Sequence, residues 1–483
     1  MKSINVAAPL ALLLLSGCVV GPEHVSPEIT LPAKFAEGPN TSNGNIADTA
    51  WWTAFRDSRL NGYVDQGLAQ NLSVLQALER INQAEAAVIT AGAGGLPSLD
   101  LTADGDRAGA ERLGGTVSPT SLETRTSASA SLSASWFLDL FGLYKRSRES
   151  ALAQLGAAYA SVDVARLTLL SQLVAAYIDV RYYQERIAIA RENLSSRRET
   201  LELTRLQLEA GAASRLDVVQ AEGLVNSTLA EIPGLETQFR QAAHRVATLL
   251  GLPASSLLPE LQKGARQPVA RFKASAGVPA DLIRNRPDIR AAERQLASAV
   301  AEIGVAEAQL YPAITLSGAI RPSYTRVVGG SEGGLLNWSF GPGLSLPIFD
   351  GGALKANLSS AESSARESYL SWKETVLNAV EEVENALAAV ARDARTVEAL
   401  RNTVRSYEEA LDLATASYRD GASSLLDVLD AQRQVSTAQA NLAAAVQQMA
   451  QDFVALNVAI GGGYGYATGG GPLVASAAAL PTK

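Results

Sequence analysis

The chain has 483 residues, of which 47% are hydrophobic and 19% are charged, with 49 acidic against 41 basic side chains. One cysteine, Cys18, and two histidines, His24 and His244, exclude an intrachain disulfide or thiolate zinc site and argue against a Ser-His-Asp triad or a His-rich metal site. A net charge of −8 without a basic cluster argues against nucleic-acid binding. We therefore expect no catalytic residue, no metal and no cofactor.

Residues 1–17 have the composition of a secretory signal peptide, with Lys2 followed by an apolar run and then by small residues. Their ending before Cys18 resembles a bacterial lipoprotein signal, in which the cysteine is lipidated and becomes the new N-terminus. The alternative is an ordinary signal with a chance cysteine. No run of 18 apolar residues follows, so we expect any membrane span to consist of strands.

Two sequence patterns each occur twice, which predicts an internal tandem repeat. The segment 96–101 (LPSLDL) recurs as 311–316 (YPAITL), and 211–218 (GAASRLDV) recurs as 421–428 (GASSLLDV). Each copy has the same order of elements, which is a helix, two strands, a very long helix, a Gly turn and a shorter helix.

The repeat determines the expected domain organisation of the chain. The chain comprises a signal peptide (1–17), an N-terminal periplasmic extended segment (18–55), repeat 1 (56–251), a linker or equatorial region (252–283), repeat 2 (284–461) and a Gly/Ala-rich C-terminal tail (462–483).

Four segments alternate apolar and polar residues with a period of two, which predicts strands with one apolar face. Two lie in each repeat, at about 97–105, 125–138, 313–322 and 337–348. The apolar face would meet a second sheet in a soluble sandwich and lipid in an outer-membrane barrel. Four strands cannot close a barrel, so in a membrane the chain must share one with copies of itself. Two copies give eight strands with a filled interior, and three give twelve strands and a lumen, so the sequence favours three only for a conduit.

Two helices longer than 60 residues are predicted at 144–210 and 353–420, each reaching roughly 100 Å if unbroken. Valine, leucine and alanine residues of the second helix step by four and three, the pattern of coiled-coil packing. Long antiparallel helices that continue directly from membrane strands predict a tube that projects from the membrane.

These signals together resemble the TolC-like outer-membrane efflux proteins, in particular their lipoprotein branch. The match covers nearly the whole mature chain in order. It includes Cys18 with Gly21, Trp51 with Trp52, the segments 286–293 (RPDIRAAE) and 347–352 (PIFDGG), and Asp427 with 430–432 (DAQ).

The resemblance implies a mainly α protein with membrane β-structure. Its long antiparallel helices would form an α-helical barrel in the periplasm, and its four strands would contribute to a trimeric 12-stranded transmembrane β-barrel in the outer membrane. It further implies a homotrimer that docks to a periplasmic adaptor (membrane fusion) protein and to an inner-membrane transporter of the RND type. The chain would then be the exit duct for small molecules such as drugs.

The two Gly turns fall at the helix ends farthest from the strands, so they would form the periplasmic mouth. Gly211 and Gly421 suit left-handed positions that end a helix, and Ser214 and Ser424 suit N-caps. Asp217 and Asp427 could serve only as capping carboxylates, and we favour that structural role for Asp217. Small tip residues would allow an adaptor to dock closely, and the candidate contacts are Gly211, Ala212, Ala213, Ser214, Gly421, Ala422, Ser423 and Ser424.

The resemblance also implies a periplasmic gate in the second turn. Its first candidates are Asp427 and Asp430, which lie three residues apart on one helix face. The first turn has Gln220 at the position that corresponds to Asp430. The remaining gate candidates are Leu426, which matches an apolar constriction, and Tyr418 and Arg419, which match residues that hold neighbouring helix pairs closed. Each also has a simpler interpretation as helix packing or as a favourable charge at a helix end.

Three other functions stay open from the sequence. A duct for type I protein secretion would have the same architecture and differ only in its partners. A periplasmic structural coiled-coil trimer would leave the alternating strands unexplained. A secreted enzyme is the weakest alternative, because 461–463 (GGG) lacks the Gly-Lys-Ser/Thr ending of a phosphate-binding loop.

Overall fold

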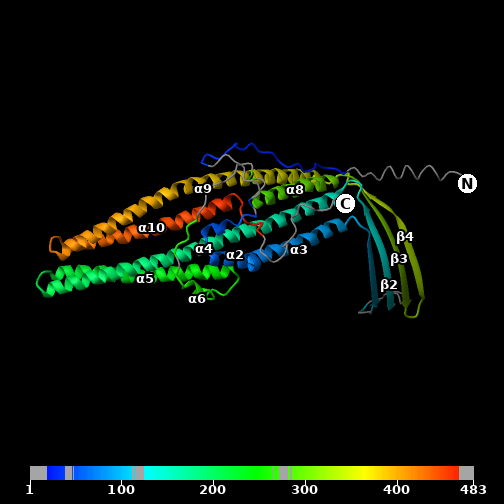
Figure 1. Ribbon diagram of the computed structural model, residues 1–483. Helices are drawn as coiled ribbons and strands as arrows, with labels where there is room; N and C mark the ends of the chain where they lie inside the picture. Colours follow the sequence, from blue (N-terminus) through cyan, green and yellow to red (C-terminus); the bar gives the residue numbers. More distant parts are fainter. Residues whose placement is uncertain are drawn as a thin grey trace. The chain divides into compact units, whose positions relative to one another are not determined.

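The structure is a computed structural model that describes residues 19–37, 46, 48–110, 114, 124–264, 266–270, 281–282 and 286–466. Cys18 and the expected signal peptide lie outside the described residues. The elements, labelled as in Figure 1, are η1 (Trp51–Phe55), α2 (Ser58–Gln70), α3 (Leu72–Ala93), β1 (Ser98–Ala108), β2 (Arg125–Leu138), α4 (Leu143–Glu209), α5 (Arg215–Leu249), α6 (Leu258–Leu261), α8 (Pro287–Ala308), β3 (Ala313–Val327), β4 (Glu332–Ser345), α9 (Ala353–Arg419) and α10 (Leu425–Ala459).

The helices confirm the internal repeat and the mainly α fold class. Helices α4 and α9 have 67 residues each, and α5 and α10 have 35 residues each. Leu143 corresponds to Ala353 and Arg215 to Leu425, a shift of 210 residues in both cases. The two halves therefore build hairpins of equal length, which we call the first hairpin (α4 and α5) and the second hairpin (α9 and α10).

All four strands form one antiparallel sheet in the order β1-β2-β3-β4. Strand β2 of the first repeat pairs with β3 of the second repeat, from Arg125 opposite Val327 to Leu138 opposite Ile314. The repeats thus share a sheet rather than building one each. Within the described residues, β1 and β4 are edge strands with one unpaired side.

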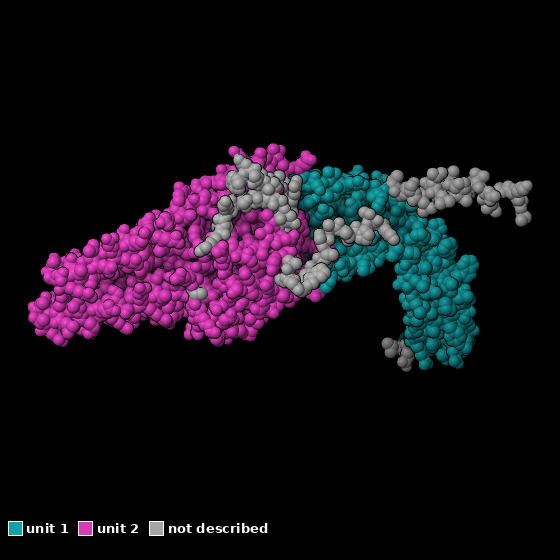
Figure 2. Space-filling view, viewed as in Figure 1, with its two compact units in different colours: residues 1–27, 81–158, 292–372 teal, residues 28–80, 159–291, 373–483 magenta. Residues whose placement is uncertain are grey.

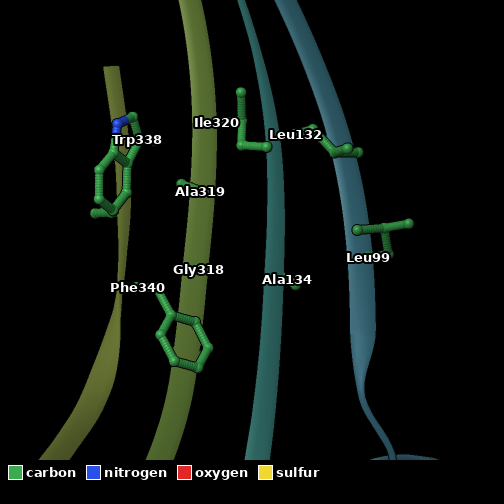
Figure 3. Close-up of a pocket in the computed structure, with 9 residues that line it drawn as sticks. Leu99, Leu132, Ala134, Gly318, Ala319, Ile320, Trp338 and Phe340 are labelled. Carbon is green, nitrogen blue, oxygen red and sulfur yellow. The ribbon is translucent and has the colours of Figure 1, made fainter. Parts of the chain in front are cut away.

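One face of this sheet is apolar and uncovered by the chain itself. Strand register aligns two rows of side chains on this face: Leu99, Ala134, Gly318 and Phe340, then Leu101, Leu132, Ile320 and Trp338. Figure 3 shows most of these residues around a shallow hollow of about 360 Å³. Trp338 and Phe340 are 77% and 75% exposed. On the opposite face Asp104 accepts a hydrogen bond from Ser129 at 2.8 Å. An apolar outer and a polar inner face are typical of membrane barrels.

Three of the four strands have boundaries that differ from those expected, and the differences have local causes. Strand β1 continues to Ala108 and β3 to Val327 because their whole lengths find partners on β2. Strand β4 occupies 332–345 rather than 337–348. It starts earlier because Glu332 pairs in register with Arg326 of β3, and it ends before Pro347, which has no backbone N–H to donate.

The chain divides into two compact units that do not follow the two repeats (Figure 2). Unit 1 comprises 1–27, 81–158 and 292–372, and unit 2 comprises 28–80, 159–291 and 373–483. Each unit takes residues from both repeats. The repeats are therefore not separate compact bodies.

The N-terminal segment and the tail each contribute to the core of unit 2. Residues 51–55 form the 3₁₀ helix η1 rather than extended chain, with Trp51 and Trp52 buried in an extensive hydrophobic cluster. The Trp51 indole donates to the Gly462 carbonyl at 3.1 Å, and a Cβ at Gly463 would lie 2.8 Å from that indole nitrogen. Residues 462–466 are thus packed chain rather than tail. The remainder, 467–483, lies outside the described residues.

Helix α4 contains an 18-residue window that is long and apolar enough to cross a membrane by length and composition alone. Polar and charged residues interrupt this window, so it is not a continuous run of 18 apolar residues and does not contradict the expectation that any membrane span consists of strands. Half of this window is buried inside the fold, which is typical of a core helix.

Candidate functional site: the helix-tip turns

Both hairpin turns have the same backbone geometry. Gly211 and Gly421 adopt φ values of +76° and +72°, in the left-handed region that favours glycine. Ala212 N–H donates to the Gln207 carbonyl at 2.7 Å and Ala422 N–H donates to the Ser417 carbonyl at 2.8 Å. These bonds run from the third residue past each helix back to its last turn, which is the Schellman motif.

A capping box then starts the next helix in both turns. Asp217 accepts the backbone N–H of Ser214 at 2.8 Å, and Asp427 accepts that of Ser424 at 3.0 Å. The serine hydroxyls also donate to these carboxylates, at 2.7 and 2.9 Å. The structural reading of Asp217 therefore fits the geometry, and Asp427 has the same capping contacts in addition to any role in a pore.

The small tip residues lie at the surface of both turns. Six of the eight candidates are exposed and the other two, Ala213 and Ser423, are partly exposed. The turns consequently present short side chains and backbone to solvent. No partner chain is present in the structure, so their contact with an adaptor stays a prediction.

The two hairpin tips pack against each other through one hydrophobic cluster, hereafter the tip cluster. It draws on all four helices, and its buried members are Leu194, Leu201, Val218, Ala221, Val225, Tyr418, Leu425, Val428 and Leu429. Burial of these side chains fixes which face of α5 and α10 turns inward. Leu426, one position away, is left 58% exposed.

Tyr418 belongs to this cluster, whereas Arg419 does not. The Tyr418 side chain is 8% exposed, and its hydroxyl lies 3.5 Å from that of buried Thr204 on α4. Arg419 is exposed and ends α9, where a cation favours the helix dipole. Tyr418 therefore ties the two hairpins of one chain together, and any contact with a neighbouring chain is not needed to explain its burial.

Asp430 is held by side chains of its own helix. Its carboxylate accepts from Arg433 at 2.9 Å and from Gln434 at 2.6 Å. Both Asp430 and Arg433 are about half exposed, so this ion pair contributes little to stability. Leu426 and Arg433 also border a surface groove of about 270 Å³ between α5 and α10. The second tip thus combines an exposed leucine with two solvent-accessible carboxylates.

Sequence reasoning missed a buried polar layer behind the tip cluster. Arg197 of α4 is 7% exposed, donates to the Thr228 hydroxyl, and its Nε has no hydrogen-bond partner among the described residues. Burial lowers the pKa of Arg197, and the opposing influence of Glu231, which raises it, is partly offset by nearby Arg433, which lowers it. Gln432 donates to Thr200 at 2.8 Å in the same layer. No sequence signal marked it, since mixed charges on a long helix usually indicate a solvated face.

An acidic pair farther along the second hairpin was also missed. Asp393 of α9 faces Asp452 of α10, and burial together with that second carboxylate raises the pKa of Asp393 to about 6. Asp393 Oδ2 is buried and has no hydrogen-bond donor, while Asp452 accepts from Gln448 at 3.0 Å. A proton on Asp393 would supply the missing bond between the two carboxyl groups.

Taken together, an open sheet with an apolar outer face and two long hairpins with small-residue tips define a subunit of a membrane-spanning channel. The family model described as "Outer membrane efflux protein" matches residues 63–252 and 278–462. The chain belongs to the outer membrane efflux protein family. It is an outer-membrane channel protein that extends into the periplasm, and not an enzyme.

Individual relatives agree over almost the whole length. Nodulation protein T of Rhizobium leguminosarum bv. viciae is 58% identical over 464 residues, covering 96% of this chain and 94% of that protein. Outer membrane protein OprJ of Pseudomonas aeruginosa is 34% identical over 89% of this chain and 90% of its own length.

Solved structures agree as well. The outer-membrane channel OprN matches with a TM-score of 0.81 at 32% identity, covering 92% of this chain and all of that one. The open state of the MtrE outer membrane channel of Neisseria gonorrhoeae matches with a TM-score of 0.79 at 30% identity, covering 92% and 99%. The predicted TolC-like fold is thereby confirmed.

Proposed function

We propose that this protein is the exit duct of a tripartite efflux system and passes small molecules from an adaptor and an RND-type transporter to the outside. The observation that carries the proposal is a four-stranded sheet that has two unpaired edges within the described residues and continues into two helices of 67 residues. Open edges are not tolerated in lipid, and three chains would close a barrel of twelve strands around a lumen.

The names of several relatives favour small molecules over proteins as cargo. They include pyoverdine export, solvent efflux and toluene efflux outer membrane proteins of Pseudomonas, at 31–32% identity. The name of nodulation protein T, from Rhizobium leguminosarum bv. viciae and also from bv. trifolii, specifies no cargo. Type I protein secretion is the alternative, and export assays separate the two.

A gate at the second tip is part of the proposal. Three copies would bring three Asp427 and three Asp430 carboxylates around one axis, with exposed Leu426 beside them. Such a ring attracts cations and repels itself unless ions bridge it. Small residues at both tips would receive the adaptor.

Lipidation of Cys18 would add a second attachment to the membrane. Each buried methylene of an acyl chain contributes about 0.8 kcal/mol, so several chains hold firmly. Mass spectrometry of the mature N-terminal peptide tests this directly. An unmodified Cys18, or a mature chain that starts elsewhere, would contradict it.

Deletion of the gene, followed by complementation with the tagged protein, tests the duct itself. We expect the deletion strain to accumulate small fluorescent efflux substrates and the complemented strain to clear them. The tag should also recover an adaptor and an RND-type transporter after cross-linking. Normal dye efflux in the deletion strain, together with loss of a secreted protein, would favour the secretion alternative instead.

A further inference from the structure

Exposed apolar side chains gather just beyond the two edge strands of the sheet. After β4, Ile348 and Phe349 are 92% and 93% exposed, more than any other large hydrophobic side chain that the structure describes. Two residues before β1, Leu96 is 65% exposed, and Ile89, near the end of the preceding helix α3, is 74% exposed. All four residues belong to unit 1. Water would contact roughly the full apolar surface of the first two, which is unfavourable.

The segment after β4 is held firmly by the chain that follows it. The Asp350 carboxylate accepts the backbone N–H groups of Gly352 and Leu354, both at 2.8 Å, and so caps α9. Gly351 and Gly352 adopt φ values of +68° and +92°, which favour glycine. Phe349 therefore projects from a fixed turn rather than from a loose loop.

The segment before β1 is fixed in a different way. The Gly95 carbonyl accepts the indole N–H of Trp136 at 3.1 Å. A Cβ at Gly94 would lie 2.1 Å from the ring of Tyr144, so only glycine permits this close approach. Leu96 consequently stands on an ordered backbone next to the edge of the sheet.

Strand topology places these two segments at the same end of the sheet. Ser98 at the start of β1 pairs with Ser135, which pairs with Ser317, which pairs with Gly341 near the end of β4. Strands β1 and β4 run in opposite directions, so β4 of one copy can pair with β1 of the next in antiparallel fashion. Neighbouring strands lie about 4.8 Å apart. Residues just after β4 would then lie beside residues just before β1 of the partner subunit.

We propose that residues 346–349 of each subunit pack on Leu96 and Ile89 of the partner subunit, which buries the exposed leucine, isoleucine and phenylalanine side chains. The occupant of each surface is thus a second copy of this chain. The contact is heterologous, since different patches meet, and it closes into a ring when three copies complete the barrel. It rests on the proposed trimeric duct and assigns the residues that join its subunits below the barrel.

Site-directed cross-linking in outer-membrane preparations tests the contact. We expect Phe349→Cys combined with Leu96→Cys to give covalent dimers and trimers with a short bifunctional maleimide, and neither single variant to do so. The single variants also report any contribution from Cys18. A matched pair combines Leu96→Cys with Leu335→Cys, which is 70% exposed on β4 but lies toward the opposite end of the sheet. This pair should stay monomeric on denaturing gels.

The outcomes separate this contact from the trimer itself. If lysine-reactive reagents capture trimers but Phe349→Cys with Leu96→Cys does not cross-link, lipid covers these side chains and the contact is wrong. If no reagent captures trimers, the proposed duct fails and the contact fails with it.

A stability measurement gives a second, independent test. Phe349→Ala should lower the temperature at which trimers dissociate in mild detergent, and Phe349→Leu should restore most of that loss. Ile320→Ala is the matched control, because Ile320 is 51% exposed on the same sheet but lies on the central strand β3, out of reach of a neighbour. Equal effects of Phe349→Ala and Ile320→Ala would overturn the contact.

Discussion

The first and second hairpins are built to the same plan and differ in the chemistry of a few positions. Helix lengths, left-handed glycines, Schellman bonds and capping boxes are the same in both. At corresponding positions the first hairpin has Leu208, Glu209, Gln220 and Tyr183, where the second has Tyr418, Arg419, Asp430 and Asp393. The features that occur in both hairpins are therefore those that folding requires. The residues that differ between the hairpins indicate a function specific to the second one.

The largest expected effect is on packing at the tip cluster. Tyr418→Ala should destabilise the second tip by about 3 kcal/mol, because it removes a buried ring that contacts α4. Leu208→Ala, its counterpart, should cost about half as much, since Leu208 is only partly buried. Hydrogen exchange of tip amides measures both. An equal loss of amide protection in the two variants would contradict the expected difference between the two tips.

Conductance tests the carboxylates that only the second tip combines. Replacing Asp427 and Asp430 together with alanine should raise the half-blocking concentration of a divalent cation about tenfold, equivalent to about 1.4 kcal/mol. Planar-bilayer recordings give this value. The matched variant, Asp217→Ala with Gln220→Ala, should leave block nearly unchanged. Similar block in both double variants would remove the proposed gate from the second tip.

Capping should respond equally in the two hairpins. Ser214→Ala and Ser424→Ala should each destabilise their own turn by about 1 kcal/mol, because each removes a hydroxyl from a capping box. Exchange rates of the first-turn amides of α5 and α10 provide the readout. If only one variant lost stability, the two capping boxes would differ in free energy despite their equal geometry.

The smallest effect concerns pH and the acidic pair of the second hairpin. The folded pKa of Asp393, about 6, lies above its usual value of 3.8, so the folded state binds more protons than the unfolded state between these values. Stability of the hairpin should therefore fall as pH rises through this window. Because Asp393 is only partly buried, we expect less than about 1 kcal/mol.

Asp393→Asn should abolish this pH dependence and stabilise the hairpin at pH 7, as it removes repulsion with Asp452. Thermal unfolding of the purified protein between pH 4 and pH 7 measures the change. Asp412→Asn, an exposed position on the same helix, is the control. An unchanged pH profile in Asp393→Asn would show that other titratable groups determine the pH dependence of stability between pH 4 and pH 7.

Features that depend on a short stretch of chain could be predicted from the sequence. Alternation revealed the strands, and Gly211 with Gly421 revealed the turns, because period-two patterning and left-handed glycines act locally. The burial of Arg197 and the facing of Asp393 and Asp452 could not be predicted. Both features depend on which faces of two helices contact each other, and the residues involved are more than 30 positions apart in the sequence. A heptad pattern alone does not determine how each helix is rotated about its axis.

The equal lengths of the two hairpins restrict how this chain can change in evolution. An insertion of one helical turn in α4 and α5 would move the first tip by about 5.4 Å and pull Val218 away from Leu425 and Tyr418. A compensating insertion in α9 and α10 would restore the fit. Length variants that still fold should therefore carry matching insertions in the two hairpins, at positions about 210 residues apart.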